Sequence, residues 1–185
     1  MSNVSYDPSK KFLNPDRLLM RAGIMVGQVV ADLGAGAGYF SIAAGKIVGN
    51  NGEVFSVDVL ESALEHVNAD ARMQNVHNIR SLRADLELPH SLDKIVTGTC
   101  HAVLMINILH QIKNKQNLFN HAYRLLHTGG KLLVVDWNDQ PFPVGPRAED
   151  RISEEQVDSL AQKCHLKLTS RTEADPYHYS MIYIK

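Results

Sequence analysis

The stretch Val29-Val-Ala-Asp-Leu-Gly-Ala-Gly-Ala-Gly-Tyr-Phe40 carries the strongest fold signal in this chain of 185 residues. An apolar run contains Asp32 near its end, and three alternate glycines follow at Gly34, Gly36 and Gly38. A short apolar run, a glycine turn and a helix-compatible segment are typical of a buried strand that leads into a helix N-terminus. Proteins of the α/β class hold nucleotide-like ligands at such junctions. The alternative is a structural turn that binds no ligand.

The glycine spacing restricts the kind of ligand. The dinucleotide fingerprint G-x-G-x-x-G needs its last glycine at position 39, where this chain has Tyr39. The pattern D-x-G-x-G-x-G that is present therefore disfavours a nicotinamide dinucleotide. Glycine permits positive φ and lets the backbone approach a ligand without a Cβ between them. We expect this close approach at Gly34 and Gly36.

A second acidic residue ends the next predicted strand. Residues 53–58 read Glu-Val-Phe-Ser-Val-Asp, and Asp58 lies 20 residues after Gly38. One ionised carboxylate can accept hydrogen bonds from both hydroxyls of a ribose, so this position suits a ribose diol. The alternative is that Asp58 caps a helix that begins near Glu61.

A third acidic residue follows a third predicted strand. Residues 79–88 read Ile-Arg-Ser-Leu-Arg-Ala-Asp-Leu-Glu-Leu, which indicates a strand that runs into a loop containing Asp85. The tripeptide Ala-Asp-Leu alone is a weak signal. Acidic residues after three successive strands reinforce one another, because the carboxyl ends of parallel strands lie along one edge of a sheet.

Strand-like and helix-like segments alternate along the chain, which predicts a parallel sheet with helices on both faces. Asn14 and Pro15 open a short helix that Gly23 closes, and Ser153 with Gln156 forms a capping-box pattern. We find no internal repeat and no second domain, so residues 1–185 are expected to form one domain. Strands are expected at 29–33, 53–58, 79–83, 99–106, 131–136, 164–170 and 179–184, and further helices at 38–47, 61–75 and 115–126, the last broken by Thr128, Gly129 and Gly130.

Composition excludes several classes of protein. The formal net charge is −1, with 19 basic and 20 acidic residues, so a basic face for nucleic acid is not expected. No apolar stretch approaches the length of a membrane span, and the N-terminus lacks a signal-peptide pattern. Two cysteines are too few for a disulfide framework, and a cytoplasmic location is expected. The nine histidines show no i, i+4 pair, so no metal site is expected.

The D-x-G-x-G-x-G pattern resembles motif I of the class I S-adenosylmethionine-dependent methyltransferases. Two further segments, Met105-Ile-Asn-Ile-Leu-His110 and Thr128-Gly-Gly-Lys-Leu132, resemble the small type 11 enzymes related to the quinone-biosynthesis C-methyltransferases. The resemblance extends from about residue 11 to the end. It implies a doubly wound, Rossmann-like, mostly parallel seven-stranded sheet whose last strand is antiparallel and lies beside strand five.

The resemblance also implies which residues bind S-adenosylmethionine. Asp58 matches the ligand of the adenosine ribose, and Asp85 with the amide of Leu86 matches the ligands of the adenine. Asp32 would accept hydrogen bonds from the amides of the glycine loop or, through water, from the ammonium group of the cofactor. The full set of expected cofactor-binding residues is Asp32, Gly34, Ala35, Gly36, Gly38, Tyr39, Phe40, Asp58, Val59, Asp85, Leu86 and Asn107.

The methyl acceptor is expected to be a small molecule that attacks the methyl group in line. Catalytic candidates are Asn107 and His110 after strand four and His178 before strand seven; a structural role for His110 is about as good an explanation. Trp137 either stacks on a substrate or packs in the core, and Arg147 and Arg151 are expected on the surface. The proline-containing loop 137–152 and the segment 11–15 are candidate walls of the pocket. A homodimer is left open.

Alternatives within this fold are weakened by missing motifs. Enzymes that methylate nucleic-acid amines carry an Asn/Asp-Pro-Pro-aromatic motif where this chain has Asn107-Ile-Leu-His110. Arsenite methyltransferases need more than two cysteines. A function of another class stays open, namely a non-catalytic partner subunit that keeps the cofactor-binding fold.

Overall fold

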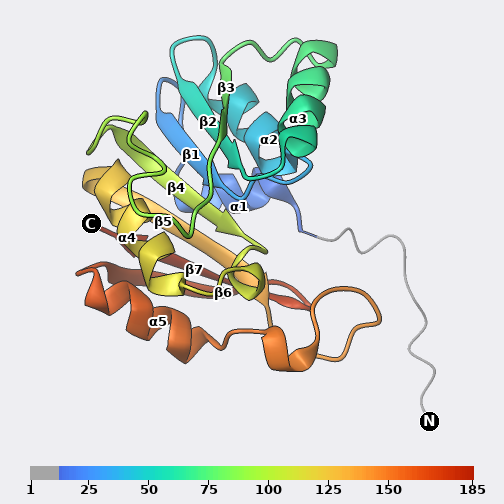
Figure 1. The fold of residues 1–185 in the computed structure, drawn as a ribbon, viewed down its shortest axis with the longest axis vertical. Helices are drawn as coiled ribbons and strands as arrows, with labels where there is room; N and C mark the ends of the chain where they lie inside the picture. The colour runs from blue at the N-terminus through green and yellow to red at the C-terminus, as the bar shows by residue number, and fades with distance from the viewer. Residues whose placement is uncertain (1–12) are drawn as a thin grey trace.

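A single seven-stranded sheet organises residues 13–185, the part of the chain that the computed structural model describes (Figure 1). The strand order is β3-β2-β1-β4-β5-β7-β6. Pairing from β3 to β5 is parallel, whereas β7 is antiparallel to both β5 and β6. The expected doubly wound fold, with strand seven beside strand five, is thereby confirmed. The strands are β1 (Val29–Leu33), β2 (Glu53–Asp58), β3 (Ile79–Arg83), β4 (Cys100–Ile106), β5 (Leu126–Trp137), β6 (Lys167–Asp175) and β7 (His178–Ile184).

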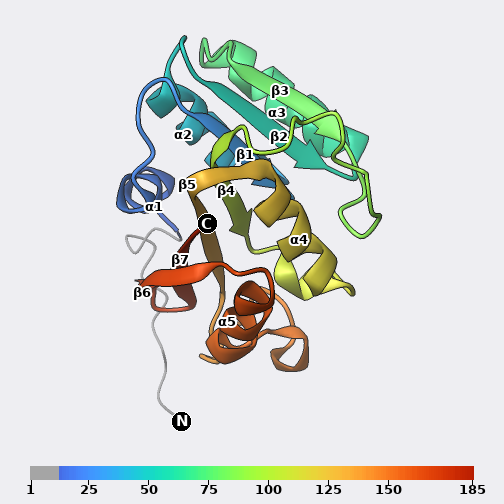
Figure 2. The same ribbon diagram turned by 90° about the vertical axis from the view of Figure 1, so that its left-hand side faces the viewer.

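Helices cover both faces of the sheet (Figure 2). Side chains alternate between the faces of a strand, so Val30 packs beneath α1 and α2 while its neighbour Ala31 belongs to the core beneath α4 and α5. Helix α3 packs beside α2 through Ala71 and Ile42. The helices are α1 (Pro15–Ala22), α2 (Tyr39–Val48), α3 (Glu61–Met73), α4 (Lys115–Leu125) and α5 (Glu154–Lys163), with short 3-10 helices η1 (Leu109–Gln111) and η2 (Ala148–Asp150).

The expected helix caps are confirmed. The side chain of Asn14 accepts a hydrogen bond from the amide of Arg17, and Gly23 ends α1 in the left-handed region at φ 74°. Ser153 and Gln156 exchange both hydrogen bonds of a capping box at the start of α5. These local signals place the ends of helices on the two opposite faces of the sheet.

Several predicted boundaries are wrong. Strand β4 begins at Cys100 rather than 99, and α2, α3 and α4 differ from their predicted ranges by one or two residues. Strand β5 begins at Leu126 rather than 131, because the chain passes directly from α4 into an extended residue that pairs with Cys100. Strand β6 begins at Lys167 rather than 164, because Cys164 and His165, with φ 61° at His165, still form the turn after α5. It ends at Asp175 rather than 170, because it pairs with β7 as far as His178. Strand β7 includes His178, which pairs with Trp137.

Among residues 13–185 we find no helix with both the length and the apolar composition that a membrane span requires. In the same range, no three His, Cys, Asp or Glu side chains are arranged as a metal site.

Candidate functional site at the carboxyl ends of the strands

The strand order reverses between β1 and β4, and the glycine loop lies at this switch point. The amides of Gly34 and Ala35 both donate to the carbonyl oxygen of Val57, each at 2.9 Å. The loop between β1 and α2 is therefore fixed to the end of the neighbouring strand β2. These two backbone contacts help to set the shape of the loop.

The three glycines have different reasons to be glycine. A Cβ built on Gly34 would lie 2.6 Å from Ile108, and one on Gly38 would lie 2.6 Å from Val67. Both positions also have φ near 80°. At Gly36, with φ 53°, a Cβ would meet no atom within 4 Å. Gly34 and Gly38 are thus required by packing, whereas the backbone at Gly36 faces open space and can approach a ligand.

Asp58 is partly buried at the tip of β2 and touches the glycine loop directly. Its Oδ2 accepts a hydrogen bond from the amide of Gly36 at 2.9 Å, and its Oδ1 accepts from the amide of Leu60 at 2.9 Å. The second contact supports the chain where it enters α3, so part of the capping alternative holds. Each carboxylate oxygen accepts more than one hydrogen bond, so Asp58 can still bind a ligand.

Asp32 is buried behind the glycine loop and accepts a hydrogen bond of 2.7 Å from the Ser41 hydroxyl. Burial raises the pKa of Asp32 to about 6, with a further increase from the nearby Asp58 charge, against the lowering effect of Ser41. The expectation that Asp32 accepts from loop amides is wrong for Gly34, Ala35 and Gly36, whose amides bond to Val57 and Asp58.

Two cavities meet at the glycine loop. The Asp32 cavity, of about 580 Å³, is lined by Asp32, Asn107 and the loop, and also by Leu13 and Pro15 of the predicted wall segment. Residues 11 and 12 of that segment lie outside the described residues. The Asp58 cavity, of about 500 Å³, lies on the other side of the loop. The Asp32 cavity contains the predicted Gly34, Ala35, Gly36, Tyr39 and Phe40, and the Asp58 cavity contains the predicted Gly34, Gly36, Asp58, Val59, Asp85 and Leu86.

Gly38 is the expected cofactor residue that lines neither cavity, since it packs on Val67 and begins α2. In the Asp58 cavity, Asp85 holds its own turn by accepting from the amide of Glu87 at 2.9 Å. The carbonyl of Leu86 is held by Asn117 of α4 at 3.1 Å. The wall opposite Asp58 is therefore a fixed turn.

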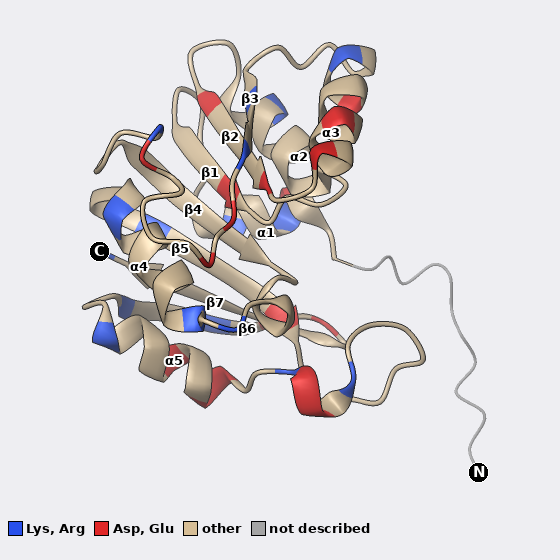
Figure 3. Cartoon of the chain, viewed as in Figure 1, with Lys and Arg blue, Asp and Glu red and all other residues tan. Residues whose placement is uncertain are grey.

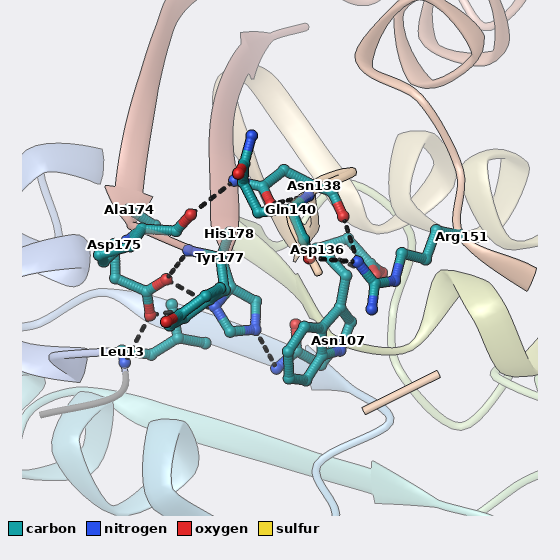
Figure 4. A network of polar contacts seen from close by, with 12 residues as sticks. Leu13, Asn107, Asp136, Asn138, Gln140, Arg151, Ala174, Asp175, Tyr177 and His178 are labelled. Carbon is teal, nitrogen blue, oxygen red and sulfur yellow. Dashed lines mark hydrogen bonds and ion pairs between the residues drawn. The ribbon is translucent and has the colours of Figure 1, made fainter. Parts of the chain in front are cut away.

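Asn107 follows β4 in the left-handed region, with φ 52°. Asparagine tolerates this conformation better than most side chains, and the Asn107 amide donates to Val135 at 2.8 Å. The side-chain nitrogen Nδ2 lies 3.3 Å from Nε2 of His178 (Figure 4). The structure thus brings together two of the three catalytic candidates.

His178 is fully buried at the start of β7. Its Nδ1 lies 2.8 and 3.0 Å from the two carboxylate oxygens of Asp175. Its ring centroid is 4.2 Å from that of Trp137, which is itself buried. The packing of Trp137 against His178, and against the backbone of Gly145, supports the core alternative for this tryptophan.

His110, the third catalytic candidate, faces a separate space. It lies on η1 and lines the His110 cavity, of about 870 Å³, which also includes Arg151. Its Nδ1 is 3.7 Å from the buried Asp136, too far for a hydrogen bond. Asp136 instead accepts from the amides of Leu109 and Trp137 and so fixes η1 to the end of β5.

Arg151 is not the solvated surface residue that its type suggests. Its guanidinium group donates to the carbonyls of Asn138, Gln140 and Pro146, at 2.8 to 3.2 Å, and lies 5.7 Å from the Trp137 ring centroid. It thereby fixes the loop between β5 and α5. Arg147, in contrast, is exposed, as expected.

Gln111, which was not predicted from the sequence, lines all three cavities. Ile108 and Ile112 were also missed, and both line the Asp58 cavity. All three lie within five residues of Asn107, immediately after β4. Their position at the switch point between β1 and β4 was the available signal.

These observations define a doubly wound protein with two cavities that meet at a glycine loop at the switch point. Residues 24–179 match a family described as a methyltransferase domain. The chain belongs to this family, the S-adenosylmethionine-dependent methyltransferases, and the recognition made from motif I is confirmed. The open backbone at Gly36 and the available carboxylate of Asp58 fit S-adenosylmethionine, the cofactor of this family.

Individual relatives agree with this assignment. The ubiquinone/menaquinone biosynthesis C-methyltransferase UbiE of Haemophilus ducreyi is 34% identical over 125 residues, 65% of this chain and 46% of that protein. An arsenite methyltransferase of Halobacterium salinarum is 26% identical over 66% of this chain and 30% of its own length. The chain thus spans less than half of these curated relatives. A SAM-dependent methyltransferase of Aquifex aeolicus shares the fold, with a TM-score of 0.85 and 22% identity over 96% of this chain and 93% of that chain.

Proposed function

We propose that this protein transfers the methyl group of S-adenosylmethionine to a small-molecule acceptor by in-line displacement. The observation that carries the proposal is the open backbone at Gly36, which lies between two cavities and is hydrogen-bonded to the partly buried carboxylate of Asp58. Family membership supports the reaction, and the cavities support binding of a cofactor with two dissimilar halves.

The residues of the Asp58 cavity would hold the adenosine half. Asp58 would accept from the ribose hydroxyls, while Asp85 and the amide of Leu86 would bind the adenine, with Val59 at its flank. The residues of the Asp32 cavity would hold the methionine half. These are the loop residues Gly34, Ala35 and Gly36, the side chains of Tyr39, Phe40 and Asn107, and Asp32, with Gly38 fixing the loop behind them.

S-adenosylmethionine, when bound, supplies a methyl group on a positively charged sulfur that is already open to attack. The chain therefore has mainly to orient an acceptor, and orientation can lower a barrier by up to about 7–11 kcal/mol. The His110 cavity and the Asp32 cavity share Gln111 in their lining, so His110 is proposed to remove a proton from acceptors that carry one. His178 is fully buried, so we propose that it serves the reaction through Asn107.

A small-molecule acceptor suits the charge distribution. Figure 3 shows basic and acidic residues interspersed over the described residues, and the net charge is −1. A cytoplasmic enzyme with no nucleic-acid partner is part of the proposal, as is one domain over the whole chain. The oligomeric state, including a homodimer, is to be measured. Because UbiE is named for ubiquinone and menaquinone biosynthesis, precursors of these quinones are the first acceptors to test.

The test combines calorimetry with a labelled-methyl assay. We expect S-adenosylmethionine and S-adenosylhomocysteine to bind, and label to pass from S-adenosylmethionine to a small product in a metabolite extract or a quinone precursor. Binding without any labelled product would favour the non-catalytic subunit. Failure of both ligands to bind would overturn both functions. Sizing of the same sample by light scattering gives the oligomeric state.

A further inference from the structure

Asp175, which was given no role from the sequence, contacts Leu13, Tyr177 and His178 in the polar network of Figure 4. It ends β6, and its carboxylate accepts from the amides of Tyr177 at 2.8 Å and Leu13 at 3.1 Å. The same carboxylate contacts Nδ1 of His178 with both oxygens. One side chain thus joins the wall segment of the Asp32 cavity to the β6–β7 turn and to a buried histidine.

These contacts determine where the proton on the histidine lies. Burial alone would raise the pKa of Asp175, but the hydrogen bonds from His178, Tyr177 and Leu13 lower it below its ordinary value. An ionised carboxylate only accepts hydrogen bonds. Nδ1 of His178 therefore carries a proton, and in the neutral ring Nε2 is left as an acceptor.

The same logic extends to Asn107. Its Nδ2 lies 3.3 Å from Nε2 of His178, so the NH₂ end of the amide donates to the ring and the carbonyl end is turned away. That oxygen, Oδ1, is buried and has no hydrogen-bond partner in the part of the chain that the structure describes. Buried polar atoms rarely lack a partner. Asn107 also lines the Asp32 cavity, so a ligand bound there would lie beside this residue.

We propose that Asp175 is a positioning residue that acts through His178 to turn the Asn107 carbonyl oxygen toward the ammonium group of the cofactor. This inference rests on the proposed function, because it takes the Asp32 cavity as the site of the methionine half. An ammonium group is favoured over a neutral donor because the acidic residue Asp32 lines the same cavity. Asp175 itself does not line that cavity and acts at a distance from the ligand.

The first test needs no variant that could fail to fold. Nitrogen NMR of the ligand-free protein, with ¹⁵N-labelled histidine and at alkaline pH, reports which ring nitrogen of His178 carries the proton. We expect the Nδ1–H tautomer, the minor form of free histidine. An Nε2–H ring in the wild-type protein would overturn the inference. A His178→Gln variant assigns the signal.

The second test uses two ligands that differ at the group in question. S-adenosylhomocysteine carries the ammonium group, whereas 5′-methylthioadenosine lacks the whole amino-acid end. The side-chain amide introduced by Asp175→Asn can donate to Nδ1 of His178, which would reverse the hydrogen bonds and turn the NH₂ end of Asn107 toward the cavity. We expect about tenfold weaker binding of S-adenosylhomocysteine and unchanged binding of 5′-methylthioadenosine. Glu173→Gln, in the exposed part of the same strand, is the matched control and should change neither.

Rescue separates positioning from a structural role. Aspartate, like asparagine, tolerates the left-handed backbone, so Asn107→Asp should fold. Its carboxylate can accept from both the His178 ring and the ammonium group. Combined with Asp175→Asn, it should restore the binding of S-adenosylhomocysteine. Equal affinity of wild type and Asp175→Asn would overturn the positioning role, as would equal loss of both ligands. If S-adenosylhomocysteine fails to bind the wild-type protein, the proposed function fails instead.

Discussion

The glycine loop and the β6–β7 network lie on either side of Asn107, and they are built in different ways. The loop is held by β2, whose residues follow it by about one strand–helix unit, and its contacts are backbone amides with one carboxylate. The network joins the amide of Leu13 to the side chain of Asp175 across 162 residues, and the side chains of Asn107 and His178 across 71 residues. Local sequence describes the first region, whereas the second exists only after the sheet has closed.

This difference predicts which substitutions each region tolerates. The loop depends on backbone conformation and on space near Cα positions, so added atoms should harm it most. The network depends on which atom donates and which accepts. Substitutions that keep the shape of a side chain but exchange a hydrogen-bond acceptor for a donor should therefore harm it most. The following experiments test that division.

Gly38→Ala should have the largest effect, and on stability. A Cβ would lie 2.6 Å from Val67 in a residue with φ 80°. Left-handed strain of about 1–2 kcal/mol and overpacking of about 1–3 kcal/mol predict a loss of about 2–5 kcal/mol in the free energy of unfolding. Urea denaturation measures it. Gly36→Ala is the matched control, because a Cβ at this position meets no atom within 4 Å. It should weaken S-adenosylhomocysteine binding but lower the free energy of unfolding by little more than the left-handed strain. Equal stability of the two variants would contradict the division between packing and ligand glycines.

Asp58→Ala should have the next largest effect, on affinity. It removes the acceptor of the Gly36 amide together with the acceptors proposed for the ribose. Two lost hydrogen bonds to a charged group predict about 3–4 kcal/mol, or a hundredfold to a thousandfold weaker binding of S-adenosylhomocysteine. Calorimetry measures it, and Glu61→Ala, an exposed neighbour, serves as control. Unchanged affinity in a folded variant would remove Asp58 from the cofactor site.

Asp32 predicts a pH dependence of stability. Its pKa is raised to about 6 in the folded state, above the value of about 3.9 expected in the unfolded chain. Between these values the folded state binds more protons, so its contribution to stability falls as pH rises from about 4 to 6, by up to about 3 kcal/mol. Asp32→Asn should remove this contribution. Denaturation of both proteins at several pH values measures it, and parallel curves would show that Asp32 does not titrate in this window.

Arg151→Ala should have the smallest effect on stability. It tests the loop between β5 and α5, which lies beside the network. It leaves the carbonyls of Asn138, Gln140 and Pro146 without their shared donor. These atoms are near solvent, so we expect a loss of about 1–2 kcal/mol in the free energy of unfolding. Hydrogen exchange should show faster exchange confined to residues 138–150. Arg147→Ala, whose partner Glu149 is 4.0 Å away, should change neither quantity.

Much of the fold was predictable because its signals are local. Strands β1, β2 and β3 have the expected bounds, since short apolar runs ended by Asp or Gly mark them clearly. The bounds of β5 and β6 were missed where local signals misled. Gly129 and Gly130 suggested a break, yet the segment pairs with the C-terminal residue Lys185, and no local pattern reveals such a partner.

The candidate site divides in the same way. Asp58 and Gly36 were predicted from spacing, and the structure places them in direct contact. Gln111 and Asp175 were not predicted, because a glutamine in a short helix and an aspartate at a strand end are common and carry no spacing signal of their own.

Residue order was sufficient for the doubly wound fold, the glycine loop and the cofactor family, because alternation of apolar residues and positive-φ glycines are properties of neighbouring residues. Folding in three dimensions was needed to distinguish the packing glycines from the open one, to bury His178 against Asp175, and to gather three cavities around Gln111. Those features depend on distances between residues far apart in the chain, which are set when both faces of the sheet are packed.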